Sequence, residues 1–257
     1  MRVFIVDASN LVKTYGTAPY VPAMSASCDI KARDLGLHIA PGANVHLLPN
    51  VAGFVGADHV AMVMASGLHK ADEITLGLDI GTNTEVSLAA NGRLLCCSTA
   101  SGPAFEGAHI RDGMRAAPGA VERMKIVDRR IEYQTIDDEA PVGICGSGIM
   151  DSVAELRRIG VLKENGSMKS RSHPRVREIG GRPEFVLVRS GERGAPHDIV
   201  ITRQDVSEIQ LAKGAIRTGI EVLLDEAGLE VDQIQRVVVA GAFGTYLDVT
   251  SARAIGM

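Results

Sequence analysis

The segment Ile74–Ile80 constrains the fold of this chain more than any other. It is almost continuously apolar and delivers an acid, Asp79, near its carboxyl end. Such a run is typical of a β-strand that is buried on both faces. The small residues Gly81, Thr82 and Asn83 follow at once and favour a tight turn. The chain is therefore predicted to contain a buried strand that ends in a polar turn.

The residues after this turn predict a β-hairpin. Two strand-like segments, Glu85–Ala90 and Arg93–Ser98, flank Asn91-Gly92, the dipeptide most typical of a two-residue hairpin turn. Strand and helix patterns then alternate as far as a last buried strand, Arg236–Ala240. This order predicts the α/β class, with a mixed sheet that is flanked by helices.

The other elements are predicted from periodicity and turn signals. Residues 163–198 are polar and aperiodic, so we expect a loop there with one strand. Thr202 with Asp205 three residues later predicts the capped start of a long helix. Other strands are expected at Met1–Asp7, Val45–Leu48, Met124–Val127, Ile131–Gln134 and Phe185–Val188, helices ending near Gly67, Met114, Arg158, Ala227 and Met257, and an extended loop at Tyr15–Pro22.

Composition narrows the possible functions. The 257 residues are 46% hydrophobic with a net charge of −4, which favours neither a nucleic-acid nor an anionic-membrane partner. No apolar run approaches the ~18–20 residues of a membrane span. Met1–Asp7 is too short and acidic for a signal peptide, so we expect a cytoplasmic protein.

The cysteines do not form a redox or metal motif. Cys28, Cys96, Cys97 and Cys145 include no CxxC pair and no zinc or iron–sulfur spacing. Small buried thiols in a reducing compartment are the favoured interpretation, and a dithiol redox role is the alternative. Any electron carrier is therefore expected outside this sequence.

The turn after the first buried strand is a candidate anion site. Gly81 allows backbone N–H groups to approach an anion, and Thr82 and Asn83 add hydrogen bonds. Asp79 could hold Mg²⁺, directly or through water. The alternative is an ordinary β-turn, in which the same residue types are common.

Two glycine-containing segments are further candidates. The first opens a helix, where free N–H groups favour an anion but also permit a plain N-cap; it comprises Gly146, Ser147 and Gly148. The second follows the last strand and could admit a flat ligand or merely a close helix–sheet contact; it comprises Gly241, Ala242, Phe243 and Gly244.

Glu106 lies in the small, kinked segment Ser98–Gly107 and could act on a water or a metal ion, although an exposed or helix-capping acid is the alternative. The sequence has no GxSxG, no GxGxxG and no P-loop. These absences argue against a serine hydrolase, a Rossmann dehydrogenase and a P-loop enzyme.

Taken in this order, the motifs resemble those of the actin/hexokinase/acetate-kinase (ASKHA) superfamily. More narrowly, the chain resembles the carboxyl-terminal actin-like domain of the reductive activators of corrinoid proteins, of the RACo or RamA type. The stretches that carry this resemblance are Leu48–Asp58, Gly77–Glu85, Ser101–Met114, Gly143–Asp151 and Val239–Asp248.

The resemblance implies a ribonuclease H-like fold of two lobes that binds ATP or ADP with Mg²⁺ between them. It also implies an activity, in which ATP hydrolysis is coupled to reduction of a Co(II) corrinoid to Co(I). Electrons would come from a [2Fe–2S] cluster in an amino-terminal domain. A corrinoid protein would be the partner, and a homodimer is expected.

Site residues follow from the resemblance. Asp79, Gly81, Thr82 and Asn83 match the second phosphate turn, and Gly241–Gly244 match the adenosine turn. The long helix before the latter borders the nucleotide in the superfamily, so one of its charged residues, Lys213, Arg217 or Glu221, could touch ribose or base. A solvated helix face is the alternative.

The chain departs from the family pattern at three places. It has no iron–sulfur cysteine set, it has no first DIGTT turn, and it stops soon after Val239–Asp248. Within the adenosine turn, Gly241-Ala242 also stands where the family more often has two glycines. We therefore expect a truncated or split piece: a remnant of the first lobe or connecting segment over residues 1–70, and the second lobe over 71–257. Two other functions stay open, a nucleotide-independent docking or dimerisation domain and a small-molecule kinase.

Overall fold

The strands predicted around Asp79 form one mixed sheet of four strands. The computed structural model describes residues 25–257, without the side chain of Ala242. Strand β12 (Arg236–Ala240) is parallel to β3 (Thr75–Ile80), whereas β3, β4 (Thr84–Ala90) and β5 (Arg93–Thr99) pair as antiparallel neighbours. The predicted hairpin is confirmed, because β4 and β5 are joined at Asn91-Gly92, both with positive φ. In sheet order the strands are β12 (Arg236–Ala240), β3 (Thr75–Ile80), β4 (Thr84–Ala90) and β5 (Arg93–Thr99).

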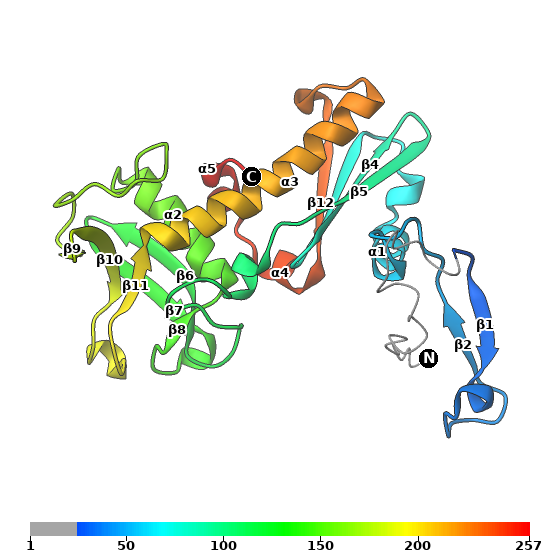
Figure 1. Ribbon diagram of the computed structural model, residues 1–257, viewed down its shortest axis with the longest axis horizontal. Helices are drawn as coiled ribbons and strands as arrows, with labels where there is room; N and C mark the ends of the chain where they lie inside the picture. Colours follow the sequence, from blue (N-terminus) through cyan, green and yellow to red (C-terminus); the bar gives the residue numbers. More distant parts are fainter. Residues whose placement is uncertain (1–24) are drawn as a thin grey trace.

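Helices cover both faces of this sheet, as predicted. The long helix α3 (Arg203–Ala227) packs on β4 and β5. Helix α1 (Ala57–Ser66) and the 3-10 helix η3 (Leu68–Lys70) lie on the other face. Figure 1 shows α3 running from β11 (Ile199–Thr202) to the β12-β3-β4-β5 sheet. The α/β class is therefore confirmed.

Two three-stranded sheets lie around the amino-terminal half of α3 (Figure 1). Helix α2 (Gly146–Arg158) packs on strand β6 (Ala120–Val127) and against helix α5 (Val249–Ile255). The first sheet has the order β7 (Arg130–Thr135), β6 (Ala120–Val127), β8 (Gly143–Ile144), and the second β11 (Ile199–Thr202), β10 (Arg182–Val188), β9 (Val176–Ile179). The predicted hairpin at 124–134 is thus β6–β7, and the helices after residues 146 and 202 are confirmed.

A separate hairpin, β1 (Cys28–Lys31) with β2 (Asn44–Leu47), lies at one end of the molecule beside α1 (Figure 1). The expected strand at Val45–Leu48 corresponds to β2. The expectations for Met1–Asp7 and Tyr15–Pro22 fall outside the described residues.

Three local predictions were wrong. The helix expected to end near Met114 is only the 3-10 helix η4 (Pro103–Glu106), because Gly107 adopts a left-handed conformation and ends it after one turn. Residues 163–198 contain two paired strands, β9 and β10, rather than one. The glycine turn expected at residues 241–244 is the start of a short helix, α4 (Gly241–Tyr246).

The long helix begins and ends as its sequence predicts. The Asp205 N–H donates to Thr202 Oγ1 over 3.2 Å, and the Thr202 N–H donates to the Asp205 carboxylate over 2.7 Å. This reciprocal capping box satisfies N–H groups that a helix start leaves free. Gly228 ends the helix in a left-handed conformation. Among the described helices, none is both long and apolar enough to cross a membrane.

Candidate functional site

The predicted phosphate turn and the segment after β12 meet at one edge of the sheet. Asp79 and Ala240 are register partners on the parallel strands β3 and β12, so both chains leave the sheet at the same end. Gly241 has φ +83°, and a Cβ there would lie 2.8 Å from Asp79 Oδ1. The Asp79 carboxylate therefore rests against backbone that only glycine leaves open.

The negative charge at this edge is poorly compensated. Burial, together with the charge of Asp58, raises the pKa of Asp79, although His59 opposes this. Burial also raises the pKa of Glu85, the register partner of Asp79 on β4. Half-buried carboxylates without a full counter-charge are suited to a hard cation such as Mg²⁺.

Asp79 would not hold Mg²⁺ through protein ligands alone. Within residues 25–257, no group of three or more His, Cys, Asp or Glu side chains is arranged to hold a metal ion. Mg²⁺ commonly binds one or two carboxylates and completes its shell with waters and substrate phosphates. The residues present therefore fit an ion that arrives with a nucleotide.

The turn after Asp79 is held by hydrogen bonds from a neighbouring segment. Ser101 Oγ donates to the Gly81 carbonyl over 3.1 Å, and the Gly102 N–H donates to the Thr82 carbonyl over 2.9 Å. Within the turn, the Gly81 N–H donates to the Asn83 carbonyl. Thr82 Oγ1 donates to the Glu106 carboxylate. The structure thus brings Glu106, from a different motif, to the candidate phosphate turn.

A mostly apolar pocket of about 460 Å³ opens beside Glu106. The rings of Phe105 and Phe243 stack at one side of it, with centroids 4.8 Å apart and planes at 25°. Gly146 packs so closely that a Cβ there would lie 1.9 Å from the Phe105 carbonyl oxygen. Glu106, Gly146 with Ser147, and Phe243 all line the pocket, so three separate motifs meet in one cavity. Its aromatic wall suits a flat ring.

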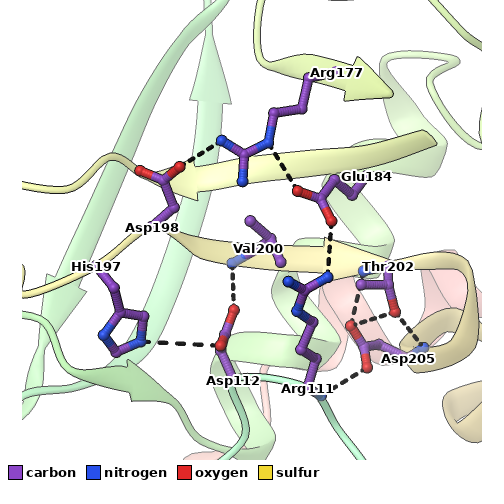
Figure 2. Close-up of polar contacts among 9 residues, drawn as sticks. All are labelled: Arg111, Asp112, Arg177, Glu184, His197, Asp198, Val200, Thr202 and Asp205. Atoms are coloured by element: carbon purple, nitrogen blue, oxygen red, sulfur yellow. Dashed lines mark hydrogen bonds and ion pairs between the residues drawn. The ribbon is translucent and has the colours of Figure 1, made fainter. Parts of the chain in front are cut away.

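A polar network fixes Arg111 and Asp112, which follow η4 in the sequence (Figure 2). The Arg111 N–H donates to Asp205 in the capping box of α3 over 2.8 Å, and Arg111 Nη1 donates to buried Glu184 over 2.9 Å. The Val200 N–H donates to Asp112 over 2.7 Å. The residues after η4 are therefore tied to β10, β11 and α3.

Some predicted residues lie elsewhere. Lys213 Nζ donates to the Ile255 carbonyl in α5, where burial lowers its pKa. Arg217 pairs with Glu221 one turn further along α3. Among the described residues that line the pocket, neither Lys213 nor Arg217 is found. Their role at a nucleotide stays a prediction, to which this arrangement adds no support.

Two predicted glycines lie in close contact with neighbouring strands. A Cβ at Gly148 would lie 2.1 Å from the Val121 carbonyl oxygen, and one at Gly244 would lie 2.9 Å from the Val239 side chain. Close helix–strand contact therefore accounts for glycine at both positions. A ligand contact at either residue stays a prediction.

Sequence reasoning missed the residues that α1 contributes. Asp58 and His59 interact electrostatically with Asp79, and His59 is buried with a relative exposure of 1%. A signal for this existed, because His59, Met62 and Val63 have the i, i+3, i+4 spacing of one helix face. Such spacing indicates a buried histidine but does not say what it faces.

Comparisons with known proteins agree with this geometry. The family model for the C-terminal domain of RACo, the ASKHA domain, matches residues 73–257. The model for the RACo middle region matches residues 4–71. A solved structure, "Reductive activator for corrinoid,iron-sulfur protein", matches with a TM-score of 0.83 and 39% identity over 94% of this chain and 39% of that chain.

Two curated relatives also match. "Corrinoid activation enzyme RamQ" of Eubacterium limosum is 37% identical over 95% of this chain and 42% of its own length. "[Co(II) methylated amine-specific corrinoid protein] reductase" of Methanosarcina barkeri is 29% identical over 81% of this chain and 39% of its own length. The chain thus spans about two fifths of these relatives. It has the ASKHA fold and belongs to the RACo family of reductive activators, of which it contains sequence from the middle region and the C-terminal ASKHA domain.

Proposed function

We propose that this chain is the ATP-binding part of a reductive activator of corrinoid proteins. The observation that carries the proposal is the convergence of two motifs at the carboxyl ends of the parallel strands β3 and β12. There the Asp79 carboxylate lies against Gly241, and the stacked Phe105 and Phe243 rings border the pocket beside Glu106. A charged end and an apolar end match the two ends of a nucleotide.

At the charged end, Asp79 would hold Mg²⁺, and Gly81, Thr82 and Asn83 would bind phosphate oxygens. Mg²⁺, when bound, neutralises phosphate charge and polarises the phosphoryl group. Thr82 Oγ1 donates to Glu106 in this structure, so its hydroxyl must leave Glu106 to donate to a phosphate. Glu106 would then be free to accept a hydrogen bond from water.

At the apolar end, the adenine ring would lie in the pocket that Phe243, Gly146 and Ser147 line. Phe105 and Gly146 fix the plane of the Phe243 ring. Burial of a flat base against an aromatic wall contributes affinity that does not depend on metal.

The proposed whole activity couples ATP hydrolysis to transfer of one electron from a [2Fe–2S] cluster to a Co(II) corrinoid, which becomes Co(I). The names of the matched relatives support a corrinoid protein as the partner. The cluster would belong to an amino-terminal domain outside these 257 residues. We further propose a cytoplasmic homodimer, with residues 71–257 as the second lobe and 1–70 as a first-lobe or connecting remnant.

Calorimetry of the 257-residue chain with ATP and ADP, each with Mg²⁺ or with EDTA, tests the proposal. We expect binding that Mg²⁺ strengthens and that Phe243→Ala weakens in both conditions by about threefold to tenfold, the equivalent of a lost aromatic contact. No binding of either nucleotide would contradict it. Binding of a corrinoid protein without any nucleotide would instead favour a docking domain, and phosphate transfer to a small molecule would favour a kinase.

A further inference from the structure

The pocket proposed to hold the base contains two charged residues that the proposed function does not use. Its lining includes Glu122 of β6 and Arg115 from the segment between η4 and β6. Glu122 is half-buried and Arg115 is exposed. Within residues 25–257, neither side chain makes a hydrogen bond or an ion pair. In a mostly apolar cavity, an acceptor and a donor without partners are available to a ligand.

A β-bulge presents Glu122 to the pocket. The register of β6 with β7 shifts by one residue between Val121 and Arg123, so Glu122 is an extra residue without a partner on β7. Val121 and Met124 are both buried, with 0% and 2% relative exposure, although residues three apart on a regular strand point to opposite faces. The bulge therefore turns Glu122 away from the core while the packing on either side of it is kept. Bulges often re-aim a side chain in this way next to an active site.

Backbone contacts hold this part of β6 against the other walls of the pocket. The Cys145 N–H donates to the Val121 carbonyl over 3.1 Å. A Cβ on Gly148 would lie 2.1 Å from the same carbonyl oxygen, so the start of α2 is in direct contact with β6. One residue after Cys145, a Cβ on Gly146 would lie 3.0 Å from the Phe243 ring. The position of Glu122 relative to the aromatic wall is thus fixed through α2.

The two charged groups match one edge of adenine. A carboxylate only accepts hydrogen bonds, and a guanidinium only donates them. Adenine carries an amino group that donates, next to a ring nitrogen that accepts. Guanine carries a carbonyl oxygen in place of that amino group, and this oxygen would be repelled by a carboxylate.

We propose that Glu122 is a specificity-determining residue of the nucleotide pocket, whose carboxylate accepts a hydrogen bond from the 6-amino group of adenine. Arg115 donates to the ring nitrogen beside that group. This inference rests on the proposed function, in which the base is adenine. Its consequence is that the β7-β6-β8 sheet selects the base, whereas the β12-β3-β4-β5 sheet binds the phosphates.

Calorimetry compares ADP with purine riboside 5′-diphosphate, which lacks only the 6-amino group, each with Mg²⁺ and with EDTA. We expect the 257-residue chain to bind ADP about tenfold more tightly, the equivalent of a hydrogen bond to a charged group. Glu122→Ala should weaken ADP binding about tenfold and change binding of the analogue by less than about twofold. Its melting temperature should stay the same, because Glu122 has no partner to lose.

Two further variants separate recognition of the amino group from a general effect of charge. Glu122→Gln keeps an oxygen that accepts, so it should retain most of the preference for ADP. Glu132→Ala is the matched control, because Glu132 is an exposed acid on β7 of the same hairpin. It should alter the affinity of neither nucleotide.

The outcomes distinguish this inference from the proposed function. Equal weakening of ADP and the analogue by Glu122→Ala, equal affinity of the wild type for both, or tighter binding of GDP than of ADP overturns the role of Glu122 while nucleotide binding stands. If the wild type binds no nucleotide, both proposals fail. If the preference for ADP is the same in EDTA and Mg²⁺ adds no affinity, the proposed magnesium site fails while recognition of the base by Glu122 stands.

Discussion

The two faces of the β12-β3-β4-β5 sheet differ in what they bury. On the face under α3, Leu78, Val86 and Leu88 are buried and belong to the main hydrophobic core. On the face under α1, the buried apolar cluster is small, comprising Met62, Val63, Leu68 and Ala89. The same face also carries polar side chains, namely Asp79, Glu85 and Ser87.

This difference shows how one sheet meets two requirements. Because side chains alternate along a strand, each strand can supply an apolar residue to α3 and a polar residue to α1 from consecutive positions. Leu78 and Asp79 are such a pair. We infer that packing on the α3 face contributes most of the free energy of unfolding. The α1 face contributes less, because it buries charged groups at the candidate site instead of apolar ones.

The largest expected effect is on the α3 face. Leu88 is fully buried, so Leu88→Ala should lower the free energy of unfolding by about 2–5 kcal/mol, through lost apolar contact and an internal cavity. Urea denaturation followed by circular dichroism measures this. Leu94→Ala is the control, since Leu94 is 42% exposed and should change stability by less than ~1 kcal/mol. A loss below ~1 kcal/mol for Leu88→Ala would contradict the assignment of stability to this face.

The next effect is on the α1 face and concerns binding. Asp79→Asn should weaken Mg²⁺–nucleotide binding by about tenfold to a hundredfold, the equivalent of a lost charged contact of ~1.5–3 kcal/mol. Stability at pH 7 should stay equal or rise, because burial raises the pKa of this carboxyl and so disfavours its ionised form in the fold.

Calorimetry and urea denaturation of Asp79→Asn test both parts of this prediction. Asp72→Asn, which changes an exposed acid just before β3, is the control and should alter neither quantity. A strong destabilisation by Asp79→Asn with unchanged nucleotide affinity would make Asp79 a structural turn residue.

A matched glycine pair compares how rigid the two faces are. A Cβ at Gly219 of α3 would lie 2.6 Å from Thr99 Cγ2 and 3.1 Å from Val86 Cγ2, both on stiff β-branched side chains. A Cβ at Gly77 would lie 2.9 Å from Leu68 Cδ2, the far end of a side chain that can turn away. Gly219→Ala should therefore cost about 1–2 kcal/mol, and Gly77→Ala less than that. Urea titrations of the two variants that give equal losses would show that the faces do not differ in rigidity.

Local signals predicted much of the fold. The buried strand at 74–80, the Asn91-Gly92 hairpin and the capping box at Thr202 each lie within a few residues, and each is confirmed. The strand at Phe185–Val188 was predicted and is part of β10, whereas its partner β9 was missed because Arg177 and Glu178 interrupt the short apolar pattern of β9. The charge of Arg177 is explained by tertiary contacts, since Arg177 donates to Glu184 and Asp198 (Figure 2).

The candidate site was predictable as a set of motifs but not as an arrangement. Asp79, Thr82 and Glu106 each carried a chemical signal, yet the bond from Thr82 to Glu106 joins segments 24 residues apart. Lys213 had the right helical spacing, but its side chain reaches α5, which no local pattern indicates. His59 was missed because its partner, Ser87, lies 28 residues away on another element.

The smallest expected effect is a pH dependence that belongs to the α1 face. Burial holds the pKa of His59 below its ordinary value of 6.5, so the unfolded chain binds a proton more readily than the folded one as pH falls through 6.5. Stability should therefore decline from about pH 7.5 to about 5.5, the window just above and below that value. His59→Gln should flatten this decline, although buried His173, whose pKa is also lowered, keeps part of it. Leu88→Ala should lower the whole curve without changing its slope, because it alters only the apolar face. Urea titrations at several pH values measure both slopes, and a decline that persists unchanged in His59→Gln would show that the polar face does not set the pH response.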